Sequence, residues 1–324
     1  MVGIDADHPD RYASLVRGNH LGAVFLVRPA GVSPALLRAR LAALQRADSS
    51  GVPLHVSVDQ EGGAVQTLRS PGFARIPSAT VQGSWTAATL RSRSRLWGRQ
   101  LSSVGITLDL APVADTVPAG TAQHNPPIGR HDRQYGATPA AVATAVATVV
   151  TALQKQGVTA TAKHFPGLGR VRVNTDTSAA AVDPRTTRKD PALDPFAAAI
   201  RAGAGAVMIS SARYPALDPS SIATFSARIV TGLLRRQMGF TGVIVSDDLG
   251  GAVAVQSVPV GDRAVRFVAA GGDLALSVRT HDAGVMTRAL SRQAGRSPRF
   301  ARQLAAAAKR VLADKERAGL LNCR

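Results

Sequence analysis

Eight short apolar runs, each followed by a longer polar or helix-like stretch, limit the folds open to this chain more than any other feature. The runs cover residues 1–5, 22–27, 54–59, 106–112, 159–165, 204–211, 242–248 and 273–278. Between them, residues 33–47, 138–157 and 226–239 carry apolar side chains at helical spacing, with Ser or Thr near each start. This alternation predicts a single (β/α)8 TIM-type barrel.

The chain shows no long Pro-, Gly- or Ser-rich linker, so we expect residues 1–324 to form one domain. The opening "MVGIDA" resembles the middle of a strand, and we therefore expect the first strand to be truncated at its N-terminus. A doubly wound open sheet is the alternative fold, but no G-x-G-x-x-G follows an early strand.

The net charge of +18 comes mostly from arginines spread along the chain. It suits an anionic partner such as a cell-wall polymer, although a codon bias toward Arg would give the same charge without one. No basic block is interleaved with aromatics, which argues against specific nucleic-acid binding. The single Cys323 excludes an internal disulfide, and no apolar run reaches the length of a membrane span. No signal peptide is visible, and a natural start further upstream would leave localisation open.

Polar residues gather where the predicted strands end. They are Asp59 and Glu61 after the third run, Asp109 and Asp115 in and after the fourth, Lys163 and His164 in the fifth, Ser210 and Ser211 in the sixth, and Asp247 and Asp248 in the seventh. The C-terminal strand ends of a barrel meet on one rim, where its chemistry takes place. Each residue also has a purely structural interpretation, such as a helix cap for Asp248 or a satisfied core histidine for His164. The joint pattern favours an active site.

Two carboxylates at the mouth of a barrel suit glycoside hydrolysis, in which one attacks or stabilises the anomeric carbon and the other transfers the proton. Polar residues at the other strand ends would then hold sugar hydroxyls. Metal-assisted hydrolysis through Asp59, His164 and Asp247 is a weaker alternative, because no H-x-H or H-E-x-x-H spacing supports it. We expect no metal and no organic cofactor.

Six segments in order, "VDQEGGAVQTL", "LAPVADT", "NPPIGRHDRQYG", "KHFPGLG", "YPALDP" and "GVIVSDDL", resemble family 3 glycoside hydrolases, and among them the bacterial β-N-acetylglucosaminidases. The resemblance covers nearly the whole chain. It implies a (β/α)8 barrel and a retaining two-step mechanism through a covalent glycosyl-enzyme.

Carried onto this sequence, the resemblance makes Asp247 the nucleophile. It places Asp59, Arg133, Lys163 and His164 where the family grips the non-reducing sugar. We add Glu61, Asp109 and Ser211 as substrate-binding candidates, because they also stand at strand ends. We expect Asp59 to accept hydrogen bonds from the two cations, and the same cations to keep Asp247 ionised.

The loop after the fifth strand departs from the family. Leu168 replaces a histidine, Asp176 stands where the family has its acid/base histidine, and Asn174 stands where an aspartate supports that histidine. Three hypotheses follow: Asp176 is the acid/base with Asn174 supporting its loop, the acid/base has moved to Glu61 or Asp115, or the protein binds sugar and turns over slowly. An anionic Asp176 would repel phosphate, which favours hydrolysis over phosphorolysis.

Together these features predict a retaining exo-β-N-acetylhexosaminidase that releases GlcNAc from peptidoglycan-derived fragments. Another family 3 β-glycosidase, such as a β-glucosidase, and a sugar-binding cell-wall protein with a weakened site are the alternatives. We expect a GlcNAc-containing substrate, an anionic cell-wall polymer as a further partner, a monomer, and an extracytoplasmic location implied by the resemblance.

Overall fold

The computed structural model describes residues 1–28, 30–47 and 51–321, and Cys323 lies outside them. Eight parallel strands form one sheet in the order β1-β2-β3-β6-β7-β8-β11-β12. Their bounds are Val2–Asp5 (β1), Ala23–Val27 (β2), His55–Val58 (β3), Leu108–Asp109 (β6), Thr159–Phe165 (β7), Ala206–Ile209 (β8), Val243–Asp248 (β11) and Leu274–Leu276 (β12). Each falls within one of the eight apolar runs.

The sheet closes on itself between its first strand and the residue that follows its last. The Gly3 amide donates to the Ser277 carbonyl at 2.8 Å, and the Ser277 amide donates to the Met1 carbonyl at 3.1 Å. A parallel bridge also joins Val2 to Ser277. The predicted (β/α)8 barrel is therefore confirmed.

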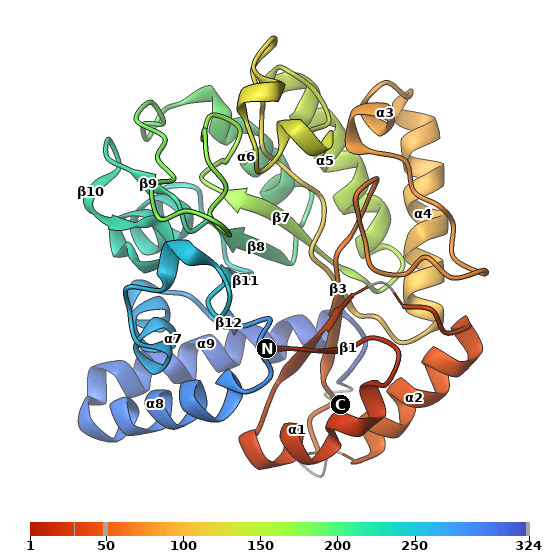
Figure 1. Cartoon of the computed structure of the whole chain (residues 1–324), viewed down its shortest axis with the longest axis vertical. Coiled ribbons are helices and arrows are strands. Elements are labelled where there is room, and N and C mark those ends of the chain that lie inside the picture. Colours follow the sequence, from red (N-terminus) through yellow and green to blue (C-terminus); the bar gives the residue numbers. More distant parts are fainter. Residues whose placement is uncertain (29, 48–50, 322–324) are drawn as a thin grey trace.

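Helices surround the barrel (Figure 1). They are α1 (Ala13–Asn19), α2 (Pro34–Ala47), α3 (Ala79–Gly83), α4 (Ala87–Ser103), α5 (Pro139–Gln154), α6 (Asp194–Arg201), α7 (Val260–Ala270), α8 (Asp282–Arg296) and α9 (Pro298–Arg317). Thr86 and Thr138 cap α4 and α5 by accepting from the amides of Thr89 and Ala141.

The helix expected over residues 226–239 forms a π-helix, η6, at Arg228–Gln237. Its buried residues are Ile229, Val230, Leu233 and Leu234, and this pattern fits an α-helix equally well. Apolar spacing therefore located the helix but could not distinguish the wider backbone ladder.

Smaller elements decorate the loops. Two antiparallel hairpins pair β4 (Gln60–Gly62) with β5 (Val65–Gln66), and β9 (Arg213–Tyr214) with β10 (Asp218–Ile222). Short 3-10 turns are η1 (Pro9–Tyr12), η2 (Ala122–His124), η3 (Gly129–His131), η4 (Pro191–Leu193), η5 (Ala223–Phe225) and η7 (Val253–Val255). The β4–β5 hairpin follows β3 directly, so it stands at the rim where the strands end.

The core has two outer layers and one inner layer. Two large clusters combine strand residues with helix residues, and they fill the space between the barrel and its helices. A third cluster consists mainly of alternate strand residues, Ala23 and Phe25, Ala206 and Met208, Val243 and Val245, and Leu274 and Leu276. Alternate residues of a strand point to the same side, so this cluster fills the barrel interior.

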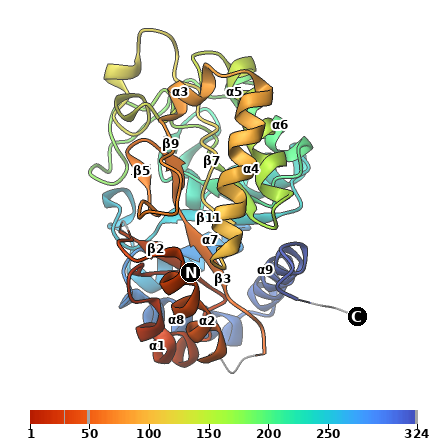
Figure 2. The same cartoon turned by 90° about the vertical axis from the view of Figure 1, so that its right-hand side faces the viewer.

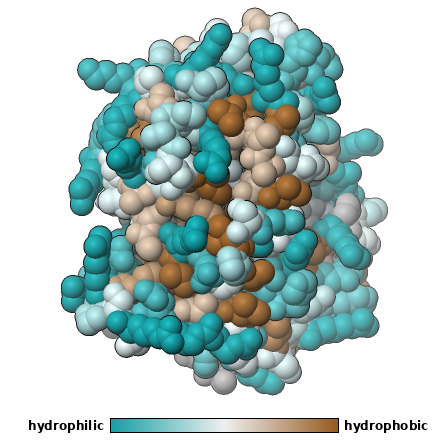
Figure 3. All heavy atoms as spheres, turned by 60° about the vertical axis from the view of Figure 1, so that its left-hand side comes forward, coloured by the Kyte–Doolittle hydropathy of each residue, from teal (hydrophilic) through white to brown (hydrophobic). Residues whose placement is uncertain are grey.

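On the face shown in Figure 3, hydrophilic side chains project outward and apolar residues form a discontinuous band between them. No helix among the described residues is long and apolar enough to cross a membrane.

Candidate active site

A cavity of about 380 Å³ opens where the C-terminal ends of the strands converge. It takes residues from β2, β7, β8, β11 and β12, from the β4–β5 hairpin, and from the segments that follow β3, β6, β7 and β12. Its polar lining is Asp59, Arg133, Lys163, His164, Asn174, Thr175, Asp176, Asp247 and Asp248. Residues far apart in sequence thus meet at the rim that the barrel fold predicts.

The floor of the cavity is apolar. Phe25, Leu110, Met208 and Leu276 line it, and all four belong to the cluster that fills the barrel interior. The position of polar residues at strand ends does not identify these apolar residues. The alternation of inward and outward side chains along each strand could have identified them.

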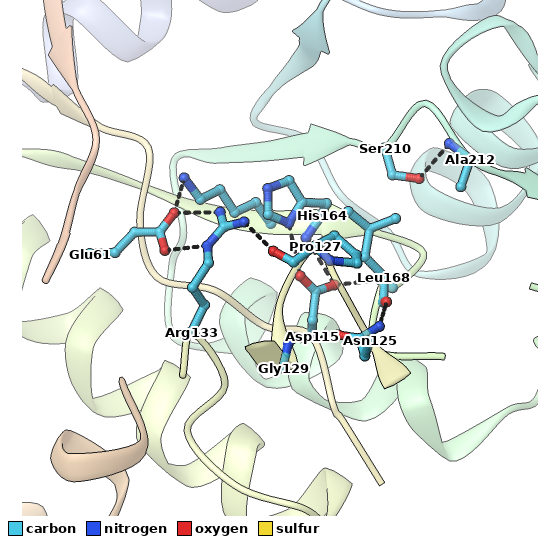
Figure 4. A network of polar contacts seen from close by, with 12 residues as sticks. Glu61, Asp115, Asn125, Pro127, Gly129, Arg133, His164, Leu168, Ser210 and Ala212 are labelled. Carbon is cyan, nitrogen blue, oxygen red and sulfur yellow. Dashed lines mark hydrogen bonds and ion pairs between the residues drawn. The ribbon is translucent and has the colours of Figure 1, made fainter. Parts of the chain in front are cut away.

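Lys163 lies between two carboxylates at one end of the cavity. Its Nζ is 2.6 Å from Asp59 Oδ1 and 2.5 Å from Glu61 Oε1. Arg133 grips the same Glu61 with two bonds, Nε to Oε2 at 2.9 Å and Nη2 to Oε1 at 2.7 Å (Figure 4). A third bond from Arg133 Nη1 to the Pro127 carbonyl at 2.7 Å fixes the guanidinium.

Glu61 is the buried counter-ion of this cluster. Burial by itself would raise the pKa of Glu61, but Arg133 and Lys163 outweigh it and lower the pKa to about 2. Glu61 is therefore ionised at neutral pH and holds no proton to donate. The expectation that Asp59 receives both cations is wrong, because Arg133 pairs with Glu61 instead.

His164 is held by Asp115, which follows β6. His164 Nδ1 lies 2.8 Å from Asp115 Oδ2, and Asp115 Oδ1 accepts from the amides of Leu168 at 2.7 Å and His164 at 3.2 Å. Since the carboxylate accepts, we assign the Nδ1 proton to His164, which leaves Nε2 for the cavity. Asp115 is fully buried and does not line the cavity, so it supports His164 and does not meet a substrate.

Asp247 stands near the end of β11, with its Oδ1 accepting from the Asp248 amide at 2.8 Å. Desolvation raises the pKa of Asp247, His164 lowers it, and the carboxylate of Asp176 raises it. The expectation that Lys163 and Arg133 keep Asp247 ionised is therefore wrong, because both are paired elsewhere and His164 is the nearby group that favours its charge.

Asp248 organises the loop that follows β11. Its Oδ1 accepts from the amides of Gly250 at 2.8 Å and Val278 at 2.9 Å, and its Oδ2 accepts from Gly251 at 2.7 Å. The interpretation of Asp248 as a helix cap is wrong, because these bonds hold a loop and the next helical elements, η7 and α7, have Ala252 and Pro259 at their N-caps.

Asp176 lies on the exposed wall of the cavity, in the loop that departs from the family pattern. Asn174 Oδ1 accepts from the Asp176 amide at 3.0 Å, and the Asp176 carbonyl accepts from the Val253 amide at 3.1 Å. Asn125 anchors the start of the loop by donating to the carbonyls of Leu168 and Val171. The loop is thus bonded to Asn125 at its start and to Val253 at Asp176, and it presents a carboxylate near Asp247.

Three of the predicted substrate-binding residues do not line the cavity. Glu61 lies behind Lys163 and Arg133 as described above. Asp109 is 2% exposed and accepts from the Gln60 amide at 3.1 Å, and burial raises its pKa to about 8. Ser211 is 1% exposed, and its hydroxyl has no partner among the described residues. Asp109 and Ser211 were predicted to bind substrate because they lie at strand ends, but position along a strand does not specify which way a side chain points.

A metal centre finds no support in this arrangement. Within residues 1–28, 30–47 and 51–321, no three His, Cys, Asp or Glu side chains lie close enough together to hold a metal ion. Asp59 is paired with Lys163, and His164 with Asp115.

Known proteins resemble this chain in sequence and structure. The "Glycosyl hydrolase family 3 N terminal domain" matches residues 1–313. A β-hexosaminidase of Xanthomonas oryzae pv. oryzae is 37% identical over 233 residues, which are 69% of this chain and 67% of that protein.

Two solved structures extend the comparison. A β-N-acetylhexosaminidase from Beutenbergia cavernae has a TM-score of 0.95 and 42% identity, covering 98% of this chain and 96% of that one. A family 3 β-N-acetylglucosaminidase from a Paenibacillus species has a TM-score of 0.87 and 30% identity, covering 100% of this chain and 62% of that one. The motifs, the barrel and these relatives agree that the chain is a glycoside hydrolase and belongs to glycosyl hydrolase family 3.

Proposed function

We propose that this protein is a retaining exo-β-N-acetylhexosaminidase that hydrolyses terminal β-linked GlcNAc, with peptidoglycan-derived fragments as its substrates. One observation carries the proposal: Asp247 and Asp176 line the same cavity and interact electrostatically, beside a fixed set of sugar-binding groups. Two carboxylates at a sugar-sized cavity are what double displacement requires.

In the first step, an ionised Asp247 oxygen attacks the anomeric carbon while the glycosidic C–O bond breaks. Asp176 enters as the protonated acid and gives its proton to the departing oxygen, so the leaving group departs as a neutral alcohol. A bound sugar displaces water from between the two carboxylates. Mutual repulsion between the two carboxylates in this drier space favours a state that carries one proton, which the reaction requires on Asp176.

In the second step, Asp176 is a carboxylate and removes a proton from water. The resulting hydroxide attacks the anomeric carbon, the bond to Asp247 breaks, and GlcNAc leaves with its original configuration. Both carboxyls are then available for the next substrate.

The sugar-binding groups explain why cleavage would occur at the chain end. Asp59 and Lys163 offer an acceptor and donors to hydroxyls, Arg133 adds further donors, and His164 Nε2 adds another hydrogen-bonding atom. Lys163, Glu61 and Arg133 form a wall of ion pairs at that end of the cavity. A terminal sugar can enter against this wall, whereas a continuing chain would have to break it.

The choice of N-acetylhexosamine rests on the relatives, which are β-hexosaminidases and β-N-acetylglucosaminidases by name. The net charge of +18 supports action near an anionic cell-wall polymer, and we propose an extracytoplasmic location on that ground. Fractionation of the producing cells, with the protein found only in the cytoplasm, would contradict the location.

Aryl β-GlcNAc and aryl β-glucoside substrates test the function. Asp247→Ala should lose turnover of aryl β-GlcNAc by about 10⁴-fold or more, as expected for a nucleophile. Asp176→Ala should lose little with a good leaving group and at least about 100-fold with a poor one. Exposed Asp262 on α7 provides a control, Asp262→Ala, which should behave as wild type.

The other outcomes assign the alternatives. Preference for the glucoside would indicate another family 3 β-glycosidase, and no turnover with either substrate would indicate a sugar-binding protein. Full activity of Asp176→Ala with poor leaving groups would contradict the acid/base role.

Hydrolysis should prevail over phosphorolysis, because Asp176 presents an anionic side chain to any incoming nucleophile. The test compares turnover in phosphate with turnover in a non-nucleophilic buffer of equal ionic strength. Faster turnover with release of a sugar phosphate would contradict the proposal.

A further inference from the structure

A second groove lies outside the catalytic cavity, lined by residues of the β4–β5 turn, of the segments before and after α3, and of α4. Figure 2 shows where β5, α3 and α4 lie. Its volume is about 590 Å³. The groove is lined by Trp85, Trp97, Ile76, Pro77, Arg75 and Arg93, together with Gly63 and Ala74. None of these residues lines the catalytic cavity.

The two tryptophans form the aromatic wall of this groove. Their ring centroids are 6.3 Å apart, with the rings inclined by 40°. Trp97 is almost fully buried at 6% exposure, whereas Trp85 is half-buried and offers part of its surface to the groove. The carbon-bound hydrogens of a sugar ring pack well against such a surface, which is broad, rigid and apolar.

Arginines supply the charge. Arg75 and Arg93 are exposed at the groove, and Arg75 also lines an adjoining cavity of about 300 Å³ with Arg69. Among the residues that the structure describes, no carboxylate lines either space, and neither Arg75 nor Arg93 has a hydrogen-bond or ion-pair partner. Unpaired guanidinium groups beside an aromatic wall suit a carboxylate carried by a sugar.

The hairpin separates this groove from the catalytic cavity. Val65 lines the cavity, while Gly63 lines the groove. The Gly63 amide donates to the Ile76 carbonyl at 2.9 Å, and Gln82 Nε2 donates to the carbonyls of Glu61 and Pro77 at 2.8 Å each. The groove wall is therefore fixed by backbone contacts, and a ligand can occupy it without entering the catalytic cavity.

We propose that this groove is a second saccharide-binding site, selective for carboxylate-bearing amino sugars such as N-acetylmuramic acid. The sugar ring packs on Trp85, and its carboxylate pairs with Arg75 and Arg93. The choice of ligand rests on the proposed function, because muramic acid alternates with GlcNAc in peptidoglycan. Such a site would hold the enzyme on the polymer that supplies its substrate.

The chain contains two tryptophans, and both line this groove, so intrinsic fluorescence reports on its occupancy directly. The Asp247→Ala background prevents turnover. We would titrate it with a MurNAc-GlcNAc disaccharide and with neutral chitobiose. We expect a saturable fluorescence change with the disaccharide that carries the carboxylate, and binding at least about tenfold weaker with chitobiose, as loss of charge-assisted bonds implies.

Arg75→Ala and Arg93→Ala, each in the same background, should weaken binding of MurNAc-GlcNAc about tenfold. Arg99→Ala on α4 removes an equal charge from an exposed residue outside the groove, and it should bind as the parent does. Equal affinity for the two disaccharides, no fluorescence change, or unchanged binding in Arg75→Ala and Arg93→Ala would overturn the proposal.

Hydrolysis of aryl β-GlcNAc by the otherwise wild-type Arg75→Ala protein separates the two proposals. That substrate carries no carboxylate, so its turnover should not change. Groove binding without any hydrolysis by wild type would contradict the proposed function alone, and hydrolysis without groove binding would contradict this inference alone.

Discussion

Replacement of Glu61 by Gln tests whether the buried ion cluster fixes the sugar-binding end of the site. The substitution keeps the shape of the side chain and removes a charge that is paired with Arg133 through two bonds and with Lys163 through one. Lys163 is 2% exposed, so water cannot replace the lost partner. In the variant, Lys163 keeps only Asp59 as an ion-pair partner, and Arg133 keeps no carboxylate partner.

The magnitude follows from the pKa of Glu61, which is lowered from 4.5 to about 2. At 1.36 kcal/mol per pKa unit, the charge stabilises the fold by about 3 kcal/mol, at the lower edge of what breaking a buried ion pair costs. An unfolding entropy of about 2.1 cal/mol/K per residue converts this into a fall in Tm of about 4 °C for a chain of 324 residues.

The stability difference should depend on pH with a definite sign. A carboxyl with a lowered folded-state pKa stabilises above its unfolded value, and it loses this contribution as pH falls through the folded value. Glu61→Gln should therefore be less stable than wild type at pH 7, with the gap closing between about 4.5 and about 2.

Calorimetry at pH 7 and pH 3, with urea unfolding at pH 7, measures this gap. The chain offers a matched control, because its other glutamate, Glu316 on α9, is exposed and Glu316→Gln should change nothing. Loss of position at Arg133 and Lys163 should also lower kcat/KM on the order of 100-fold. A Glu61→Gln protein that melts within about 1 °C of wild type at pH 7 would refute the reasoning.

Three further predictions concern other carboxyls in and around the site. Asp109→Asn should be more stable than wild type, because a folded pKa near 8 makes the wild-type protein lose stability as pH rises from the unfolded to the folded pKa of Asp109. Over this range the stability gain of Asp109→Asn should grow by up to about 1.4 kcal/mol per pH unit. Urea unfolding at pH 5 and pH 8 measures the gain, and an equal gain at both pH values would contradict the prediction. Asp115→Asn should lower kcat about 10- to 100-fold because His164 loses its orientation, and kinetics at constant fold, checked by circular dichroism, decide this. Activity should fall on the acid side as Asp247 protonates at a pH above the ordinary range of an aspartate. In Asp176→Asn this limb should move to lower pH, measured with a good leaving group, and a shift in the opposite direction would show that Asp176 does not repel Asp247.

Part of the site could be predicted from the sequence alone. Asp59, Lys163, His164 and Asp247 were selected because they end or follow apolar strands, and all four line the cavity. The same rule also selected Asp109 and Ser211, which are buried away from it. A position at a strand end identifies the rim, whereas the direction of the side chain decides whether it reaches the cavity.

The sequence could not predict which charged residues pair with one another. Arg133 and Glu61 are 72 residues apart, and Lys163 and Asp59 are 104 apart. From charge and sequence order alone, Arg133 could pair with Asp59, and Lys163 and Arg133 could keep Asp247 ionised. The structure pairs Arg133 with Glu61 and leaves His164 as the group that favours ionised Asp247.

The sequence by itself determined the barrel, because eight apolar runs separated by helical patterns leave few other ways to bury that much aliphatic surface. It also determined which rim carries the polar residues. The tertiary structure decided which carboxylates face the substrate, which serve as counter-ions, and which apolar residues form the floor. These properties depend on distances between residues on different strands, and a local pattern sets only the direction and burial of its own segment.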